Sequence, residues 1–172
     1  MPDIDVVELP ELDTSLLPYY QEWKAEQQTD RRHGLWYYLF DLANHEIAAA
    51  FSKLFWPDFI EVDGLILLAE NYPRLGMTPE EFKQTLESNP RSIEFTVNYV
   101  SIPYMFRDNG ITMEDGVYKA VFSQQLFDYL ARVLLISWKH ALKEAYPDKE
   151  FVFFYNVDPD GANRKISFYQ RP

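Results

Sequence analysis

The longest regular pattern of apolar positions lies in the last third of the chain. Between Ser123 and Tyr146, apolar residues recur every three or four positions, while polar residues occupy the remaining side. This is the period of an amphipathic helix that buries one broad side. Pro147 cannot continue such a helix, so it marks the end. The pattern predicts one long helix over about 123–146.

Two other stretches combine β-prone runs with turn residues, and each predicts a β-hairpin. In the first, at about 59–69, the runs flank Asp63 and Gly64, a pair that is favoured in two-residue turns. Its second run, 65–68, is apolar throughout, which indicates a strand covered on both faces. The second hairpin, at about 151–170, has a turn rich in Asp, Pro and Gly.

Four further helices are predicted from their start signals. Asp13, Thr14 or Ser15 can cap the first, which has Pro18 in its first turn and ends before Gly34. Asn44 is a favoured N-cap residue, and the apolar stripe after it stops at Pro57. Thr78 and Glu81 have the spacing of a capping box. Asn89 precedes a proline, which is well tolerated at the first helical position. Helices and hairpins do not alternate as in a parallel sheet. The expected fold is therefore α+β, with a mainly antiparallel sheet from the two hairpins packed against several helices.

Three stretches have patterns that fit more than one structure. Residues 35–42 are too apolar for an exposed segment, and their period fits either a helix or a strand. Residues 101–116 contain Asn-Gly and Asp-Gly pairs and indicate a loop. Residues 117–122 either extend the long helix backwards or form a strand, and we favour the helix.

The length of 172 residues suits a single domain with its own core. Residues 1–14 contain five acids and two prolines but no base, so they predict a flexible acidic tail. The remainder, 15–172, is predicted to form one α+β domain. The first residues have neither a basic nor an apolar stretch, so no signal peptide is expected.

The charge and the composition narrow the possible partners. With 27 acidic and 16 basic residues, the net charge is -11, which disfavours binding to nucleic acid. Apolar runs are too short to span a membrane. The chain has no cysteine, which suits a reducing cytoplasm, and we expect a cytoplasmic protein. Aromatic residues make up 17% of the chain, and a minority of them are expected at a groove or interface.

Motifs for catalysis, metals and cofactors are missing from the sequence. It has no glycine-rich phosphate loop, no GxSxG elbow and no HExxH pair. Asp41, His45 and Glu46 would offer a partial metal site on one helix, but a cap at Asn44 separates Asp41 from the other two. The acidic turn that begins at Asp158 lacks the glycine position and the final glutamate of a calcium loop. We expect no catalytic residue, no metal and no cofactor.

The candidate binding residues lie around the first hairpin. Glu61 and Asp63 alternate with apolar residues, so they are expected on one face of the hairpin. Two carboxylates beside apolar walls can act as an acid and a base, although Asp63 also suits the turn itself. Trp56 and Tyr72 flank the hairpin and are residue types enriched at interfaces. These four residues form the predicted binding site.

The segment from Phe55 to Phe59, followed by Glu61, Asp63 and Gly64, resembles segments of small bacterial proteins to which no function is assigned. The chain's ending is similar in style to theirs, with a long Trp-bearing helix, a proline and a Phe-rich hairpin. The resemblance implies a bacterial source and assigns no functional residue.

The sequence favours a non-enzymatic protein-binding module, such as an immunity-type inhibitor of a basic partner. An acidic surface can steer such an inhibitor onto its target. One alternative is a small-molecule enzyme or binder with an aromatic-lined acidic pocket. Another is a structural subunit of a homo-oligomer, and the sequence does not determine the oligomeric state.

Overall fold

The computed structural model describes residues 11–27, 34–42, 44–105, 111–114, 117–120, 123–158 and 164–171. Its α-helices are α1 (Pro18–Glu26), α2 (Leu35–Leu42), α3 (His45–Phe55), α4 (Pro79–Ser88), α5 (Pro90–Val97) and α6 (Gln124–Ala145). Its short 3-10 helices are η1 (Thr14–Leu16), η3 (Tyr72–Leu75) and η4 (Ile102–Met105). Its strands are β1 (Phe59–Val62), β2 (Leu65–Leu68), β3 (Val100–Ser101), β4 (Ile111–Glu114), β5 (Val117–Ala120), β6 (Phe151–Val157) and β7 (Arg164–Gln170).

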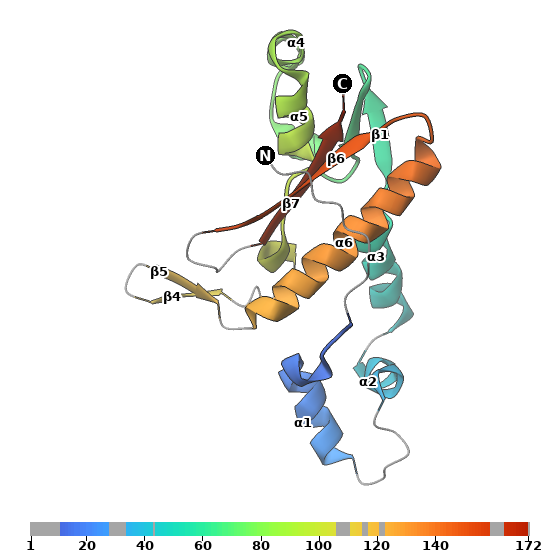
Figure 1. The fold of residues 1–172 in the computed structure, drawn as a ribbon, viewed down its shortest axis with the longest axis vertical. Coiled ribbons are helices and arrows are strands. Elements are labelled where there is room, and N and C mark those ends of the chain that lie inside the picture. The colour runs from blue at the N-terminus through green and yellow to red at the C-terminus, as the bar shows by residue number, and fades with distance from the viewer. Residues whose placement is uncertain are drawn as a thin grey trace.

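The predicted α+β class is confirmed, with all strand pairs antiparallel (Figure 1). Both predicted hairpins form: β1 pairs with β2, and β6 pairs with β7. They belong to separate small sheets: among the described residues, β7 lies between β3 and β6, while β2 pairs with β1 alone. The long predicted helix is α6, which runs diagonally across the molecule beside β6 and β7.

The predicted caps and the first turn also form. Asn44 accepts a hydrogen bond from the Ile47 backbone N–H at 2.9 Å, and Thr78 and Glu81 complete their capping box. Asp63 and Gly64 have φ angles of 49° and 83°, which are the left-handed values that a two-residue hairpin turn requires. The local chemistry of these short segments is therefore sufficient to place the element boundaries.

Residues 117–122 were predicted to favour a helix, and for 117–120 this prediction is wrong, while 121–122 lie outside the described residues. Val117–Ala120 forms β5, which pairs with β4 at Ile111–Glu114. A run of four residues fits a helix or a strand equally well until a partner strand supplies its hydrogen bonds. The same pairing replaces part of the loop predicted at 101–116 with strand. Residues 115–116, the predicted Asp-Gly turn, lie outside the described residues.

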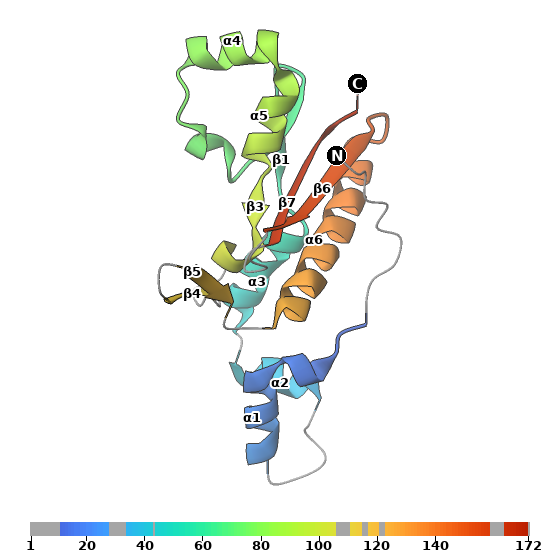
Figure 2. The same cartoon turned by 60° about the vertical axis from the view of Figure 1, so that its left-hand side comes forward.

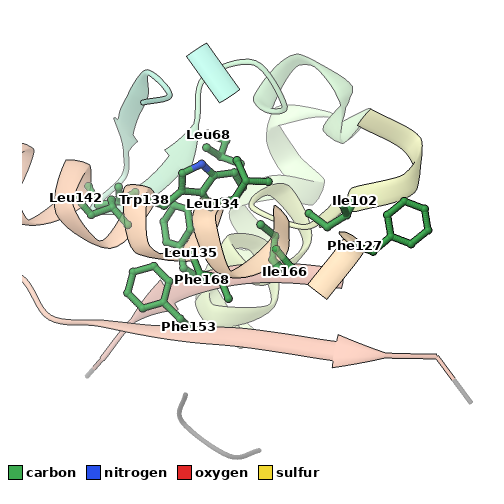
Figure 3. Packing of buried hydrophobic residues seen from close by; sticks show 12 residues of the cluster. Leu68, Ile102, Phe127, Leu134, Leu135, Trp138, Leu142, Phe153, Ile166 and Phe168 are labelled. Atoms are coloured by element: carbon green, nitrogen blue, oxygen red, sulfur yellow. The ribbon is translucent and has the colours of Figure 1, made fainter. Parts of the chain in front are cut away.

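The main core lies between α6 and the β3–β7–β6 sheet (Figure 3). Trp138 of α6 is fully buried, and its ring lies edge-on to that of Phe168 on β7. Its indole N–H donates to the Leu54 carbonyl at 2.7 Å, which connects α6 to α3. A tryptophan buried this deeply needs such a partner for its one polar atom.

A second apolar cluster covers the other face of β2. It contains Leu65 and Leu67 of β2 with Phe82 of α4, and with Ile93 and Val97 of α5. Because the alternate β2 side chains join the main core, the strand is buried on both faces, as its continuous apolar run predicted. The edge of β2 that faces away from β1 therefore needs hydrogen-bond partners within the protein.

Asn98, directly after α5, supplies part of that missing edge. Its side-chain oxygen accepts from the Leu68 N–H at 2.7 Å. Its amide nitrogen donates to the Ile66 carbonyl at 2.9 Å and to the Phe168 carbonyl at 3.2 Å. One buried amide thus connects β2 to β7, two strands that do not pair with each other.

Glu94 makes the same connection one helical turn earlier. Its carboxylate is 2% exposed, and it accepts the Ile66 N–H at 3.0 Å and the Gln170 N–H at 2.8 Å. The Gln170 side-chain amide donates to the same carboxylate at 2.6 Å. Glu94 and Asn98 together take the place of a strand between the two sheets, and sequence periodicity gave no sign of this role.

Candidate functional site

Helix α2 lies with α1 at one end of the molecule, away from the sheets, in both ribbon views (Figures 1 and 2). Its inner side packs on α1 through aromatic rings. Tyr38 lies edge-on to Tyr20 and Trp23, with ring centroids 5.4 and 5.5 Å away. Asp41 accepts a hydrogen bond from the Trp23 indole at 2.9 Å. These contacts fix which side of α2 faces α1.

The opposite side of α2 is apolar and open to solvent. At 100° per residue, Trp36 and Phe40 fall opposite Tyr38 and Asp41. Trp36 is 85% exposed and Phe40 is 83% exposed. We call the exposed large residues of α2 the aromatic helix face: Trp36, Tyr37, Leu39, Phe40 and Leu42. Exposed apolar residues continue onto α3 at Ile47 and Phe51.

The exposure of α2 contradicts the expectation that residues 35–42 are too apolar to face solvent. The physical reason is the small size of the neighbouring helix. Helix α1 covers one side of α2, and an eight-residue helix with apolar residues all around needs covering on more than one side. A surface of this kind marks an interaction site more often than an ordinary surface does.

The size of the aromatic helix face can be compared with known interfaces. A fully exposed aromatic side chain offers roughly 200 Å². The exposed fractions of the five residues then correspond to roughly 600 Å² of apolar surface. A standard protein interface buries about 800 Å² on each partner. Tyr37 and Leu42 lie beside the side of α2 that packs on α1, so a partner on the opposite side would cover part of this area.

The structure brings together two of the four residues of the predicted binding site. Asp63 and Tyr72 line one groove of about 770 Å³ between the β1–β2 turn and α4. Tyr72 packs edge-on against Phe82, with ring centroids 6.3 Å apart. Trp56 and Glu61 do not line this groove.

The other two predicted residues have separate environments. Glu61 is half exposed and forms an ion pair with Lys149 at 3.1 Å. Trp56 is exposed at the C-terminal cap of α3. Of the two carboxylates considered as an acid and a base, Asp63 lines the groove beside Tyr72 and Glu61 does not.

The partial metal site is also separated, as the cap at Asn44 indicated. Asp41 is in α2, where it binds the Trp23 indole, whereas His45 and Glu46 begin α3. No group of three or more potential metal ligands occurs within the described ranges. Asp158, the first residue of the acidic turn, forms an ion pair with Lys165 at 2.6 Å.

One polar cluster was missed by sequence reasoning. Arg164 of β7 is almost fully buried, and its Nε lies 2.6 Å from Asp128 Oδ1 on α6. The Tyr155 hydroxyl of β6 donates to the same oxygen. These residues are 36 and 27 positions from Asp128, so spacing along the chain carries no signal of their contact. The cluster connects α6 to the β6–β7 hairpin.

The cluster shifts the pKa of two of its members. Partial burial opposes ionisation of Asp128, but hydrogen bonds from Arg164 and Tyr155 outweigh it, so the pKa of Asp128 is lowered from its usual 3.8. Burial, followed by the neighbouring carboxylate, raises the pKa of Tyr155. Asp128 is therefore held ionised and Tyr155 protonated, which is the pairing of a stable structural contact.

Comparison of the chain with protein-family models, with curated proteins and with solved structures found no match. Of the helices in the described ranges, none is both long enough and apolar enough to cross a membrane.

Proposed function

We propose that this chain is a protein-binding module that docks onto another protein through the aromatic helix face. The observation that supports the proposal is the exposure of Trp36 and Phe40, opposite the side of α2 that packs on α1. Exposing two aromatic rings to water is unfavourable for the isolated protein. Covering them with a partner would recover that free energy.

The residue types of the aromatic helix face are among those that contribute most to the binding free energy of protein interfaces. Interfaces obtain most of their affinity from a few buried residues, among which Trp and Tyr are enriched. The face offers Trp36 and Tyr37 within two positions, and Phe40 one turn later. Its area of roughly 600 Å² is at the lower end of the range for specific interfaces.

The partner that we propose is a basic protein with an apolar patch, as for an immunity-type inhibitor. The net charge of -11 would attract a basic protein from a distance, and the aromatic helix face would then hold it. The two features contribute differently, because long-range charge raises the association rate while buried apolar contact slows dissociation. A cytoplasmic location belongs to the same proposal and rests on the lack of cysteine.

The test compares two tagged variants of the full chain as baits in extracts of cells that naturally make it. Trp36→Ala combined with Phe40→Ala removes the centre of the face. Trp56→Ala removes another exposed tryptophan and is the matched control. We expect wild type and Trp56→Ala to retain one basic protein that the double variant loses. With both proteins purified, the double variant should weaken binding by at least about 30-fold.

The same purified pair tests the division of roles. We expect high salt to reduce the association rate constant by about tenfold and to change the dissociation rate much less. Equal retention of the partner by the double variant would reject this face as the docking site. Loss with Trp56→Ala alone would point to the first hairpin instead. A wild-type dimer in light scattering that the double variant abolishes, with no other partner, would replace the proposal with self-association.

A further inference from the structure

A second groove, distinct from the aromatic helix face, lies where α3 meets the ends of β2 and β3. Its volume is about 800 Å³, within the range of sites that hold small molecules. Its walls come from α3, from the segment after β2 that leads into η3, and from β3 and η4. Three separate segments of the chain, 50–58, 68–74 and 99–105, converge on it together with Trp138 of α6.

The deepest part of the groove is apolar. Leu68 and Trp138 are buried there beside each other, and Leu54 and Met105 are partly buried (Figure 3). The only polar atom of the Trp138 side chain is already bound to the Leu54 carbonyl. These four side chains therefore offer no hydrogen bond to a ligand, and the part of a ligand that reaches them must be apolar.

The rim of the groove carries two cations that differ in how closely each is paired with a carboxylate. Lys53 is held by both carboxylate oxygens of Asp58, at 2.7 and 2.8 Å. Arg74 approaches Glu70 only at 3.7 Å, and both side chains are more than 70% exposed. An ion pair this long between two exposed side chains contributes little to stability. The Arg74 guanidinium is therefore the rim group that an anion can take over at little cost.

Two tyrosines also line the groove. Tyr99 is partly buried, and burial raises the pKa of its hydroxyl, which therefore stays neutral. Tyr104 is mostly exposed at the groove. Their rings can lie against the flat body of a ligand without adding negative charge, although the protein as a whole carries -11.

We propose that this groove binds a small molecule with a flat apolar body and one carboxylate. The body would lie against the partly buried Leu54 and Met105, over the almost fully buried Leu68 and Trp138. The carboxylate would bind Arg74 in the two-point geometry that guanidinium groups favour. Binding would displace Glu70 from Arg74. The site requires no catalysis and does not depend on the aromatic helix face.

The test uses the full chain labelled with 5-fluorotryptophan and observed by fluorine NMR. The chain has four tryptophans, of which only Trp138 lines the groove, and single Trp→Phe variants assign the other three signals. The probes are 1-naphthylacetate and its neutral amide, which share one aromatic body. We expect the acid to shift the Trp138 signal saturably and to bind about tenfold more tightly than the amide, a 1.4 kcal/mol difference.

Two variants of exposed residues should change the affinity for the acid in opposite directions. Arg74→Ala should lower it to the level of the amide, and Glu70→Gln should raise it up to about fivefold by freeing Arg74. Arg91→Ala, an exposed arginine outside the groove, is the matched control and should change nothing.

Several results would overturn the proposal. The first is that millimolar probe does not shift the Trp138 signal. The second is that the acid and the amide bind equally tightly. The third is that Arg74→Ala leaves the affinity for the acid unchanged. A shift of the Trp36 signal without one at Trp138 would also overturn it, because the probe would then lie on the aromatic helix face.

Discussion

At the residue scale, two side chains near the end of α5 replace a neighbouring strand along β2 and β7. Backbone N–H groups in the interior must find an acceptor, and here Glu94 and Asn98 provide it for Ile66, Leu68 and Gln170. A carboxylate is an unusual residue at a fully buried position. It is accounted for here by three N–H donors that point at its two oxygens.

Replacing Glu94 tests this role. Glu94→Ala leaves the N–H groups of Ile66 and Gln170 without their acceptor, so we expect the free energy of unfolding to fall by about 2–4 kcal/mol. Glu94→Gln keeps the shape but puts an NH₂ group against a donor, so it should also destabilise, by a smaller amount. Urea denaturation measures both. Glu144→Ala, an exposed glutamate on α6, should leave stability unchanged within error, and an equal loss there would contradict the argument.

At the element scale, the packing of α6 on the β6–β7 hairpin combines an apolar core with one polar contact near the start of the helix. Trp138 and Phe168 represent the first, and the Asp128 cluster represents the second. Arg164 is almost completely buried, whereas Asp128 is partly exposed to water. Loss of the ion pair would therefore leave the Arg164 charge with less compensation from solvent than the Asp128 charge. The contact therefore makes stability depend on pH.

Asp128→Asn should lower the free energy of unfolding at neutral pH by about 1–2 kcal/mol, since the carboxylate is partly exposed and screened. Folding lowers the pKa of Asp128, so the unfolded chain binds more protons below about pH 4. The stabilising contribution is then present above the unfolded pKa of about 3.8 and is lost as pH falls through the lower folded value. Denaturation of both proteins across pH 2–7 should show their difference shrinking in acid; a constant difference would contradict the assignment.

At the scale of the whole molecule, the described elements form two parts that differ in how many packing contacts stabilise them. The β1–β2 sheet, the β3–β7–β6 sheet, α5 and α6 are joined by two apolar clusters and the polar bridges between them. Helices α1 and α2 lie apart and hold each other mainly through Tyr20, Trp23 and Tyr38 (Figure 2). A pair of short helices with one covered side has little stability of its own.

We expect native-state hydrogen exchange to show this division. Amide protons in α1 and α2 should exchange by local opening, well before those in α6 and β7, which should require global unfolding. The proposed partner of the aromatic helix face should slow exchange in α2 selectively. Equal protection of α2 and α6 in the isolated protein would show that α2 is already covered, and the docking proposal would lose its basis.

The sequence alone determined the features that depend on short-range chemistry. The caps at Asn44 and Thr78, the Asp63 turn and the length of α6 follow from residue types a few positions apart, and all of them form. The predictions that were wrong concern contacts between residues farther apart than these few positions. A strand partner for β5 is not visible within 117–122, because hydrogen bonding across a sheet depends on another segment.

Only the tertiary structure decided which surfaces are covered and which side chains meet. Hydrophobic pattern marked residues 35–42 as apolar, but covering them depends on how much neighbouring structure is available, and α1 covers one side. Glu94 meets β7 from 76 residues away, and the groove at Trp138 is assembled from separate segments. Contacts of this range arise from the packing of finished elements, so no local spacing encodes them.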